Sequence, residues 1–270
     1  MKIAAIEERG MVLLGCGKMG SAMLAGWLSG GMSPSTIWVL DPCPSDWLRS
    51  TGVFVNKGVP VNPVIALIAV KPQMMGGALP SMAALGNAST VFLSIAAGTP
   101  ISVFETALGE GSPIIRAMPN TPAAIGRGIT AVVGNANATA EHLDMADALL
   151  CAVGQVVRLD GEHQIDAVTA VSGSGPAYVF HLIETLAAAG MAEGLPAELA
   201  MKLAKATVGG AGQLAEDADE DPTQLRINVT SPNGTTHAAL KVLMDEAKGF
   251  PPLLRKAVKA AADRGLELSK

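Results

Sequence analysis

The segment at residues 11–20, MVLLGCGKMG, constrains the fold more than any other part of this 270-residue chain. An apolar run leads into a GxGxxG turn, and the small-residue stretch SAMLAGWL follows directly, so the order is strand, glycine-rich turn, helix. In that order Gly15 permits the tight turn, Gly17 lets the backbone approach a pyrophosphate, and Gly20 lets the helix pack against the strand. The segment therefore predicts a Rossmann dinucleotide-binding domain, with an ordinary strand-to-helix turn as the alternative.

The period of the apolar residues changes along the chain. Up to about residue 160, short uncharged apolar runs alternate with helical stretches, as in a parallel sheet with crossover helices. From residue 162 onward the period is helical, for example at Val179, Leu182, Ile183 and Leu186. We therefore expect an α/β fold with a Rossmann domain over residues 1–160 and an all-helical domain over residues 161–270. The predicted strands are MVLLG (11–15), TIWVLD (36–41), VIALIAV (64–70), TVFLSIA (90–96), PIIRAMP (113–119), ITAVVG (129–134) and GQVVRLD (154–160), and helix breaks are predicted at 172–176, 193–196, 219–222, 231–234 and 249–252.

Composition excludes several classes of function. The net charge is −5 and the basic residues are scattered, unlike those of a protein that binds nucleic acid or an anionic membrane. The three cysteines and four histidines lack metal-ligand or disulfide spacing, so we expect no metal. The N-terminus does not read as a signal peptide, and no apolar run approaches the ~20 residues of a membrane span. A hydrophobic content of 49% with 16% charged residues indicates an oligomer. The unpaired cysteines indicate a reducing cytoplasm, the lack of a membrane span a soluble protein, and the charge a small-molecule ligand.

Asp41 ends the second predicted strand, about 20 residues after the glycine turn, where an acidic side chain can accept hydrogen bonds from the ribose of NAD. The same carboxylate would repel a 2′-phosphate, although Arg49 and Lys57 follow within reach along the chain. An Asp that merely starts a loop before Pro42 is the alternative interpretation. The preference between NADH and NADPH therefore stays open.

A second loop, VTSPNGTT (229–236), directly precedes a helical apolar pattern. Successive amides of Gly234, Thr235 and Thr236 at a helix N-terminus would offer donors and the positive end of the helix dipole to an anion. The alternative is that Thr235 or Thr236 is only the N-cap of that helix.

Three further motifs, AVKPQ (69–73), RAMPNTP (116–122) and DAVTAVSGSGPAY (166–178), occur in order between these two loops. With this order and spacing the chain, from Met11 nearly to its end, resembles the pyrroline-5-carboxylate reductase family. Members of that family reduce the cyclic imine Δ1-pyrroline-5-carboxylate to L-proline with NADPH or NADH. The resemblance implies an imine reductase of proline biosynthesis whose helical domain is an intertwined homodimerisation module. Assembly of dimers into a ring stays open.

The resemblance and the residue patterns together assign site residues. The Thr236 hydroxyl is expected to hydrogen-bond the imine nitrogen, and catalysis is expected to be mainly orientation, with the imine carbon about 3 to 3.5 Å from the hydride-bearing nicotinamide carbon. The partner subunit is expected to complete the substrate pocket. Expected to bind the cofactor are Gly15, Gly17, Lys18, Met19, Gly20, Asp41, Asn56, Ala69, Val70, Lys71, Pro72, Ala96, Ala97, Gly98 and Asn120; expected near the substrate are Glu162, Ser172, Ser174, Ser231, Gly234, Thr235 and Thr236.

The chain departs from the family pattern in places. Residues 1–10 are extra, VNPV (61–64) replaces a small residue plus Asp, and Asn233 stands where Gly is common. Asn tolerates left-handed backbone, so the loop around Asn233 is expected to keep its shape. Asp41 is the departure that would favour NADH.

Two other functions compete. A 3-hydroxyacid dehydrogenase of the 6-phosphogluconate-dehydrogenase type shares the glycine loop and a helical second half, but needs a Lys base that SGSGPAYVFHLIETL lacks. A non-catalytic nucleotide-binding module would have lost substrate contacts, whereas the loop with Thr236 is present.

Overall fold

The computed structural model describes residues 3–87 and 89–268. Contacts within the chain divide it into two compact units. The first comprises Met1–Gly173 with Ala262–Lys270, and the second comprises Ser174–Ala261. The α/β and all-helical parts expected from the sequence are both present. That the boundary between the two domains lies at residue 160 stays a prediction.

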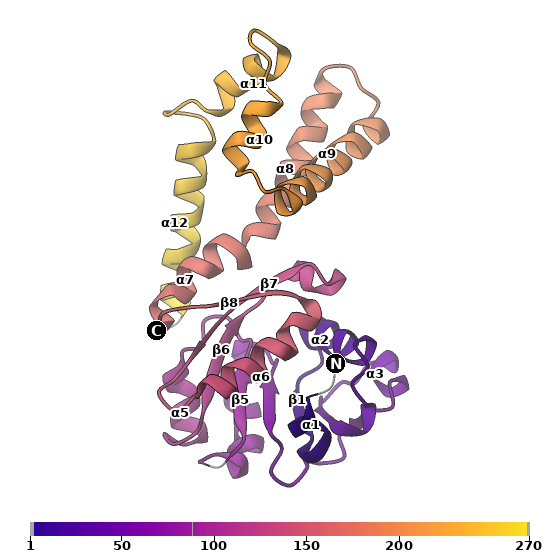
Figure 1. The fold of residues 1–270 in the computed structure, drawn as a ribbon, viewed down its shortest axis with the longest axis vertical. Helices are drawn as coiled ribbons and strands as arrows, with labels where there is room; N and C mark the ends of the chain where they lie inside the picture. The colour runs from indigo at the N-terminus through magenta and orange to yellow at the C-terminus, as the bar shows by residue number, and fades with distance from the viewer. Residues whose placement is uncertain (1–2, 88, 269–270) are drawn as a thin grey trace. The chain divides into compact units, whose positions relative to one another are not determined.

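The described residues of the first unit form an eight-stranded sheet with the order β3-β2-β1-β4-β5-β6-β7-β8 (Figure 1). All seven predicted strands are confirmed, whereas the two-residue β3 was not predicted. The strands are β1 (Met11–Leu14), β2 (Ile37–Leu40), β3 (Phe54–Val55), β4 (Ile65–Ile68), β5 (Val91–Ser94), β6 (Ile114–Met118), β7 (Gly128–Gly134) and β8 (Gly154–Arg158).

One strand pair departs from the parallel sheet that the sequence predicts. β6 and β7 pair antiparallel, whereas the other neighbouring strands pair parallel. Only residues 119–127, including the 3-10 helix η4 (Thr121–Ile125), join β6 to β7. A parallel crossover needs about a dozen residues or more, so this short connection returns the chain antiparallel.

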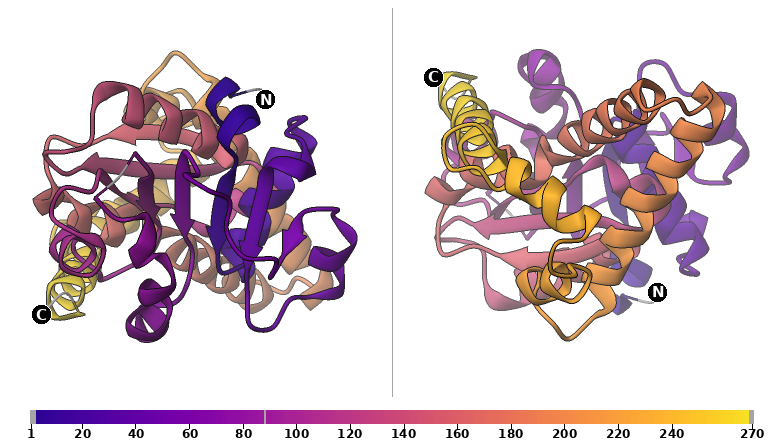
Figure 2. Two further views of the ribbon diagram at one scale, coloured as in Figure 1. Left: turned by 90° about the horizontal axis from the view of Figure 1, so that it is seen from below. Right: turned by 90° about the horizontal axis from the view of Figure 1, so that it is seen from above.

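Helices cover both faces of the sheet (Figure 2). Leu13 of β1 packs on one face with α2 (Lys18–Ser29) and α6 (Ala140–Leu150). Its neighbours Val12 and Leu14 pack on the other face with α4 (Met75–Ala78), η3 (Leu79–Leu85) and α5 (Ile101–Leu108). This alternation explains why the central strands are apolar on both sides. The unit also contains α1 (Ala4–Arg9), η1 (Pro34–Thr36), α3 (Asp46–Ser50), η2 (Pro72–Met74), η5 (Cys151–Val153), η6 (Glu162–Gln164), α7 (Ile165–Val168) and the π-helical η7 (Thr169–Gly173).

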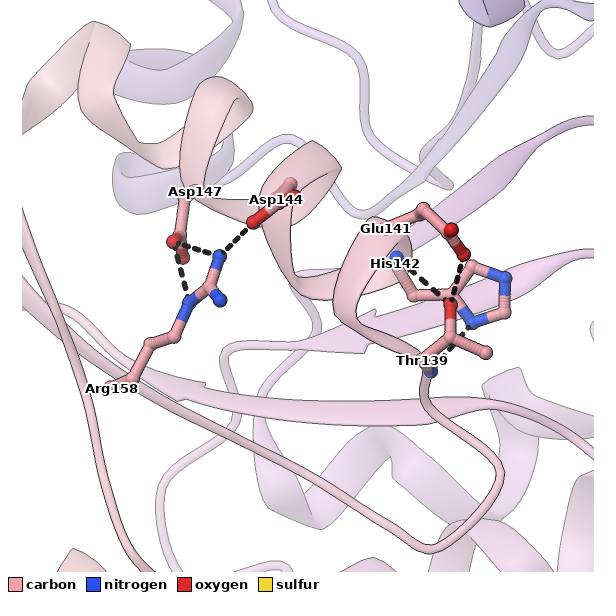
Figure 3. Close-up of polar contacts among 6 residues, drawn as sticks. All are labelled: Thr139, Glu141, His142, Asp144, Asp147 and Arg158. Carbon is pink, nitrogen blue, oxygen red and sulfur yellow. Dashed lines mark hydrogen bonds and ion pairs between the residues drawn. The ribbon is translucent and has the colours of Figure 1, made fainter.

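Polar contacts fix α6 against the edge strand β8 (Figure 3). Arg158 of β8 forms ion pairs with Asp144 and Asp147 of α6. The helix begins with a capping box, in which the Thr139 hydroxyl accepts from the His142 amide and His142 Nδ1 accepts from the Thr139 amide. These contacts are far from the glycine turn in sequence, and they hold α6 at the edge of the sheet that β8 forms.

The second unit is helical, as predicted. It contains α8 (Gly175–Ala192), α9 (Ala197–Asp217), α10 (Pro222–Asn228), α11 (Thr235–Leu243) and the larger part of α12 (Phe250–Leu268). The break predicted at residues 172–176 is confirmed at Ser174, which separates the π-helical η7 from α8 beginning at Gly175. No helix in the described chain is both long enough and apolar enough to cross a membrane.

Candidate functional site

The glycine-rich turn joins the end of β1 to the start of α2. Gly15 has φ +89°, and a Cβ there would lie 2.9 Å from Val70 Cγ1. A Cβ on Gly20 would lie 2.5 Å from the Gly15 carbonyl oxygen. A Cβ on Gly17 would meet nothing within 4 Å. Gly15 and Gly20 are thus required by the fold, whereas the turn leaves open space beside Gly17.

The N-terminus of α2 is free to bind an anion. Gly17 is its N-cap, and no side chain caps the helix. The first amides of a helix have no partner within it, and they carry the positive end of the helix dipole. Lys18 is exposed and Met19 half-buried in this first turn. The turn therefore offers backbone donors and a cationic side chain together.

Asp41 lies directly beside this turn. Its Oδ2 accepts a hydrogen bond from the Cys16 amide at 2.6 Å, and its Oδ1 accepts from the Cys43 amide at 2.8 Å. Asn56 holds the backbone of Asp41 from both sides, donating to the Asp41 carbonyl at 2.8 Å and accepting from its amide at 3.0 Å. Burial and then the Asp41 charge raise the pKa of the Cys16 thiol from 9.0 to about 11. Asp41 and Asn56 thus form one rigid group at the glycine turn.

The loops after β4 and β5 lie at the same edge of the sheet as the glycine turn, because β4 pairs parallel with β1 and β5 pairs parallel with β4. The Ala69 amide donates to the Leu14 carbonyl at 2.8 Å. Ligands of open α/β sheets bind at this carboxyl edge where the strand order reverses, which here falls between β1 and β4. The predicted cofactor residues of these loops are half-buried Ala69 and Val70, exposed Lys71 and Pro72, buried Ala96, exposed Ala97, and Gly98 with φ +67°.

Asn120, which follows β6, makes structural contacts. Its Nδ2 donates to the Ser172 carbonyl at 3.1 Å, and its Oδ1 accepts from the Ile129 amide at 3.0 Å. The Ser172 hydroxyl donates to the Val168 carbonyl at 3.1 Å within its own helical segment. Asn120 therefore ties the turn after β6 to β7 and to the π-helical segment.

Glu162 forms an ion pair with the buried side chain of Arg116, and the sequence did not predict this pair. Arg116 Nη1 lies 2.7 Å from Glu162 Oε1, and the same oxygen accepts from the Ile101 amide at the start of α5 at 2.8 Å. Arg116 Nε is buried without a hydrogen-bond partner in the described structure. The two residues are 46 positions apart, so no local pattern in the sequence could have signalled the pair.

The second predicted loop lies in the helical unit. Gly234 is the N-cap of α11, and no side chain caps this helix. The interpretation of Thr235 or Thr236 as the N-cap is therefore wrong. Asn233 has φ +59°, which confirms that the loop adopts left-handed backbone at this position. The loop leaves the first amides of α11 without partners within the helix.

The hydroxyl groups predicted at the substrate differ in their surroundings. Thr236 is half-buried and Thr235 exposed, and neither hydroxyl has a hydrogen-bond partner within residues 3–87 and 89–268. Ser231 is exposed, and Ser174 precedes α8 without capping it. Glu162 and Ser172 belong to the first unit, and Ser174, Ser231, Gly234, Thr235 and Thr236 to the second. Among the described side chains, no three of His, Cys, Asp or Glu gather as metal ligands would.

A family model and a nearly full-length relative give the same family. The family model for the pyrroline-5-carboxylate reductase dimerisation domain matches residues 162–268. The chain is 40% identical over 267 residues to the pyrroline-5-carboxylate reductase of Synechocystis sp., covering 96% of this chain and 97% of that protein.

Two solved structures agree with this result. A pyrroline-5-carboxylate reductase from Coxiella burnetii superposes with a TM-score of 0.89 and 32% identity, covering 97% of this chain and 99% of that one. The Plasmodium falciparum pyrroline carboxylate reductase with NADP bound gives a TM-score of 0.83 and 27% identity, covering 98% and 99%. This chain belongs to the pyrroline-5-carboxylate reductase family.

Proposed function

We propose that this chain reduces Δ1-pyrroline-5-carboxylate to L-proline, the last step of proline biosynthesis, with NAD(P)H supplying the hydride. The observation that carries the proposal is that one chain has both a dinucleotide-type turn and an uncapped α11 loop, and that it is 40% identical to such a reductase over nearly its full length. The competing dehydrogenase reaction requires a base that removes an alcohol proton. Reduction of an imine needs only hydrogen bonding or protonation at nitrogen.

The residues at the carboxyl edge of the sheet fit a dinucleotide. Open space beside Gly17 and the free amides of α2 suit the pyrophosphate, and Asp41 with Asn56 lies beside that turn. The loops after β4, β5 and β6 complete the cofactor site. The residues assigned to it are Gly15, Gly17, Lys18, Met19, Gly20, Asp41, Asn56, Ala69, Val70, Lys71, Pro72, Ala96, Ala97, Gly98 and Asn120.

The loop before α11 binds the substrate. Its free amides and the helix dipole hold the substrate carboxylate, and the unpartnered Thr236 hydroxyl donates a hydrogen bond to the ring nitrogen. This bond withdraws electrons from C=N and makes the carbon a better hydride acceptor. Reduction adds hydride to that carbon and a proton from solvent to the nitrogen, which becomes the secondary amine of proline. Glu162, Ser172, Ser174 and Ser231 are assigned to the surroundings of the substrate.

The enzyme acts as a cytoplasmic homodimer assembled through the helical unit. The buried hydrophobic residues of this unit, as far as the structure describes it, are the small Ala187, Ala200 and Ala204. Its large apolar side chains are instead exposed, a composition typical of a surface that a second subunit covers. They include Val179, Phe180, Leu182, Leu186, Leu195, Leu199, Leu203, Leu214, Ile227, Val242, Leu253 and Leu254.

The test is a spectrophotometric assay with racemic pyrroline-5-carboxylate and either NADH or NADPH. We expect turnover, and we expect Thr236→Ala to lower kcat/KM about a hundredfold, mainly through kcat, as for loss of one donor that acts on the transition state. Thr106→Ala, which removes an exposed hydroxyl in α5, is the matched control and should behave as the native enzyme. Nucleotide binding without imine reduction would refute the proposal and favour a hydroxyacid substrate or a binding role.

A further inference from the structure

We propose that Asp41 makes this enzyme selective for NADH over NADPH. The inference rests on the proposed function for the use of a nicotinamide dinucleotide and adds which of the two is used. The two cofactors differ only at the adenosine ribose, where NADH carries a 2′-hydroxyl and NADPH a 2′-phosphate. The selectivity must therefore come from groups that reach this ribose.

The structure fixes the Asp41 carboxylate to the turn assigned to the pyrophosphate. The Cys16 amide belongs to the GxGxxG turn and donates to Oδ2 at 2.6 Å, while the Cys43 amide donates to Oδ1 at 2.8 Å. The adenosine ribose is joined directly to the pyrophosphate. A carboxylate bonded to the pyrophosphate turn, at the end of the strand next to β1, thus lies where the ribose hydroxyls arrive.

The hydrogen-bonding capacity of the carboxylate suits a diol and opposes a phosphate. Each carboxylate oxygen accepts one amide and keeps a further lone pair for a hydroxyl donor. A fully ionised 2′-phosphate brings only acceptors and two further negative charges, so it would face Asp41 without a donor between them. Attraction to one cofactor and repulsion of the other therefore arise from the same group.

No cation in the described structure neutralises the Asp41 carboxylate. Within the described residues, Asp41 forms no ion pair with a Lys or Arg side chain, and Arg49 and Lys57 are exposed. Turning the Asp41 side chain aside would break its two amide contacts, and the two Asn56 hydrogen bonds hold the Asp41 backbone in place. Asn56 itself holds left-handed backbone, with φ +52°. The negative group is thus both unpaired and held in place.

The test compares the binding of NADH and NADPH by calorimetry in the absence of substrate. We expect the native chain to bind NADH at least about tenfold more tightly, a difference of ~1.4 kcal/mol. We expect Asp41→Ser to reduce the ratio of the two affinities by roughly tenfold or more, by weakening NADH binding and strengthening NADPH binding. Asp41→Asn keeps the shape and one acceptor, so it should gain NADPH affinity even if the Ser variant folds poorly.

Asp46→Asn is the matched control, because it removes one exposed negative charge at the start of the nearby α3 and should leave the ratio unchanged. Equal affinities in the native chain, a preference for NADPH, or an unchanged ratio in both Asp41 variants would overturn the inference. The readout is separate from imine reduction. Selective NADH binding without turnover would therefore refute the proposed reaction and leave the role of Asp41 standing.

Discussion

Arg116 carries its charge almost entirely out of water, since the residue is only 4% exposed. Within the described residues its ion pair is with Glu162, whose carboxylate also caps α5 through the Ile101 amide. A buried cation that loses its partner costs ~3–5 kcal/mol, and the partial exposure of Glu162 reduces that figure. Through this ion pair Glu162 stabilises the folded state, in addition to any contact that it makes with substrate.

We expect Glu162→Ala to lower the free energy of unfolding by about 2 kcal/mol. Glu162→Gln should cost less, because the amide oxygen can still accept from Ile101. Urea denaturation at one fixed protein concentration measures the free energy of unfolding of both variants. Glu110→Ala is the control, because Glu110 is exposed. If Glu162→Gln keeps native stability but loses turnover, the substrate contact outweighs the structural role.

Among the secondary-structure elements, the N-terminal helix α1 lies in the residues that are extra relative to the family pattern, so the family resemblance did not predict it. Its Ile6 is 1% exposed and packs into the core cluster with Trp27 and Ile37. Arg9, at its end, donates to the Asn62 carbonyl at 2.9 Å and to the Ser89 hydroxyl at 2.6 Å. The extra residues thus cover the edge of the core and tie two loops together.

Truncating Ile6 should therefore destabilise the first unit. We expect Ile6→Ala to lower the free energy of unfolding by about 2–3 kcal/mol, as for other large-to-small core changes. Glu8→Ala, an exposed change in the same helix, should stay within about 0.5 kcal/mol of the native chain. Chemical denaturation followed by circular dichroism measures both, and equal stabilities would show that α1 contributes nothing to the core.

The sequence predicted the elements with strong periodic patterns and missed those held by tertiary contacts. Apolar runs such as VIALIAV gave every strand of four or more residues. The six residues of α1 are too few to be helical alone, so Ile6 and Arg9 stabilise a helix that no local pattern announces. The antiparallel β7 was predictable from the short connection after β6, but strand direction was inferred from composition alone.

The candidate site shows the same division. The glycine turn and the α11 loop were predictable, because GxGxxG and SPNG each require a particular backbone. The contacts of Asp41 with Cys16 and Asn56, and the pairing of Arg116 with Glu162, join segments far apart in sequence that only the folded unit brings together. Single-sequence patterns do not encode such long-range pairs.

At the scale of the whole molecule, the helical unit buries almost no large side chain of its own. An apolar groove of about 460 Å³ between α8 and α9 is lined by side chains that include Leu186, Leu195 and Leu203. Leu203 is 48% exposed. Burying a leucine side chain is worth ~1.5–3 kcal/mol, and a two-fold symmetric interface counts each such residue twice. Charge on this surface should therefore weaken the proposed homodimer strongly.

We expect Leu203→Asp to raise the dimer dissociation constant about a hundredfold or more, as sedimentation velocity over a range of concentrations would show. The monomer should still bind the dinucleotide, because the glycine turn and Asp41 belong to the first unit. It should lose imine reduction if a partner subunit completes the substrate pocket. Val103→Asp, at a similarly exposed helical position of the first unit, should remain dimeric and active. If the Leu203→Asp variant and the Leu253→Asp variant each remain fully active dimers, the subunits must associate through another surface.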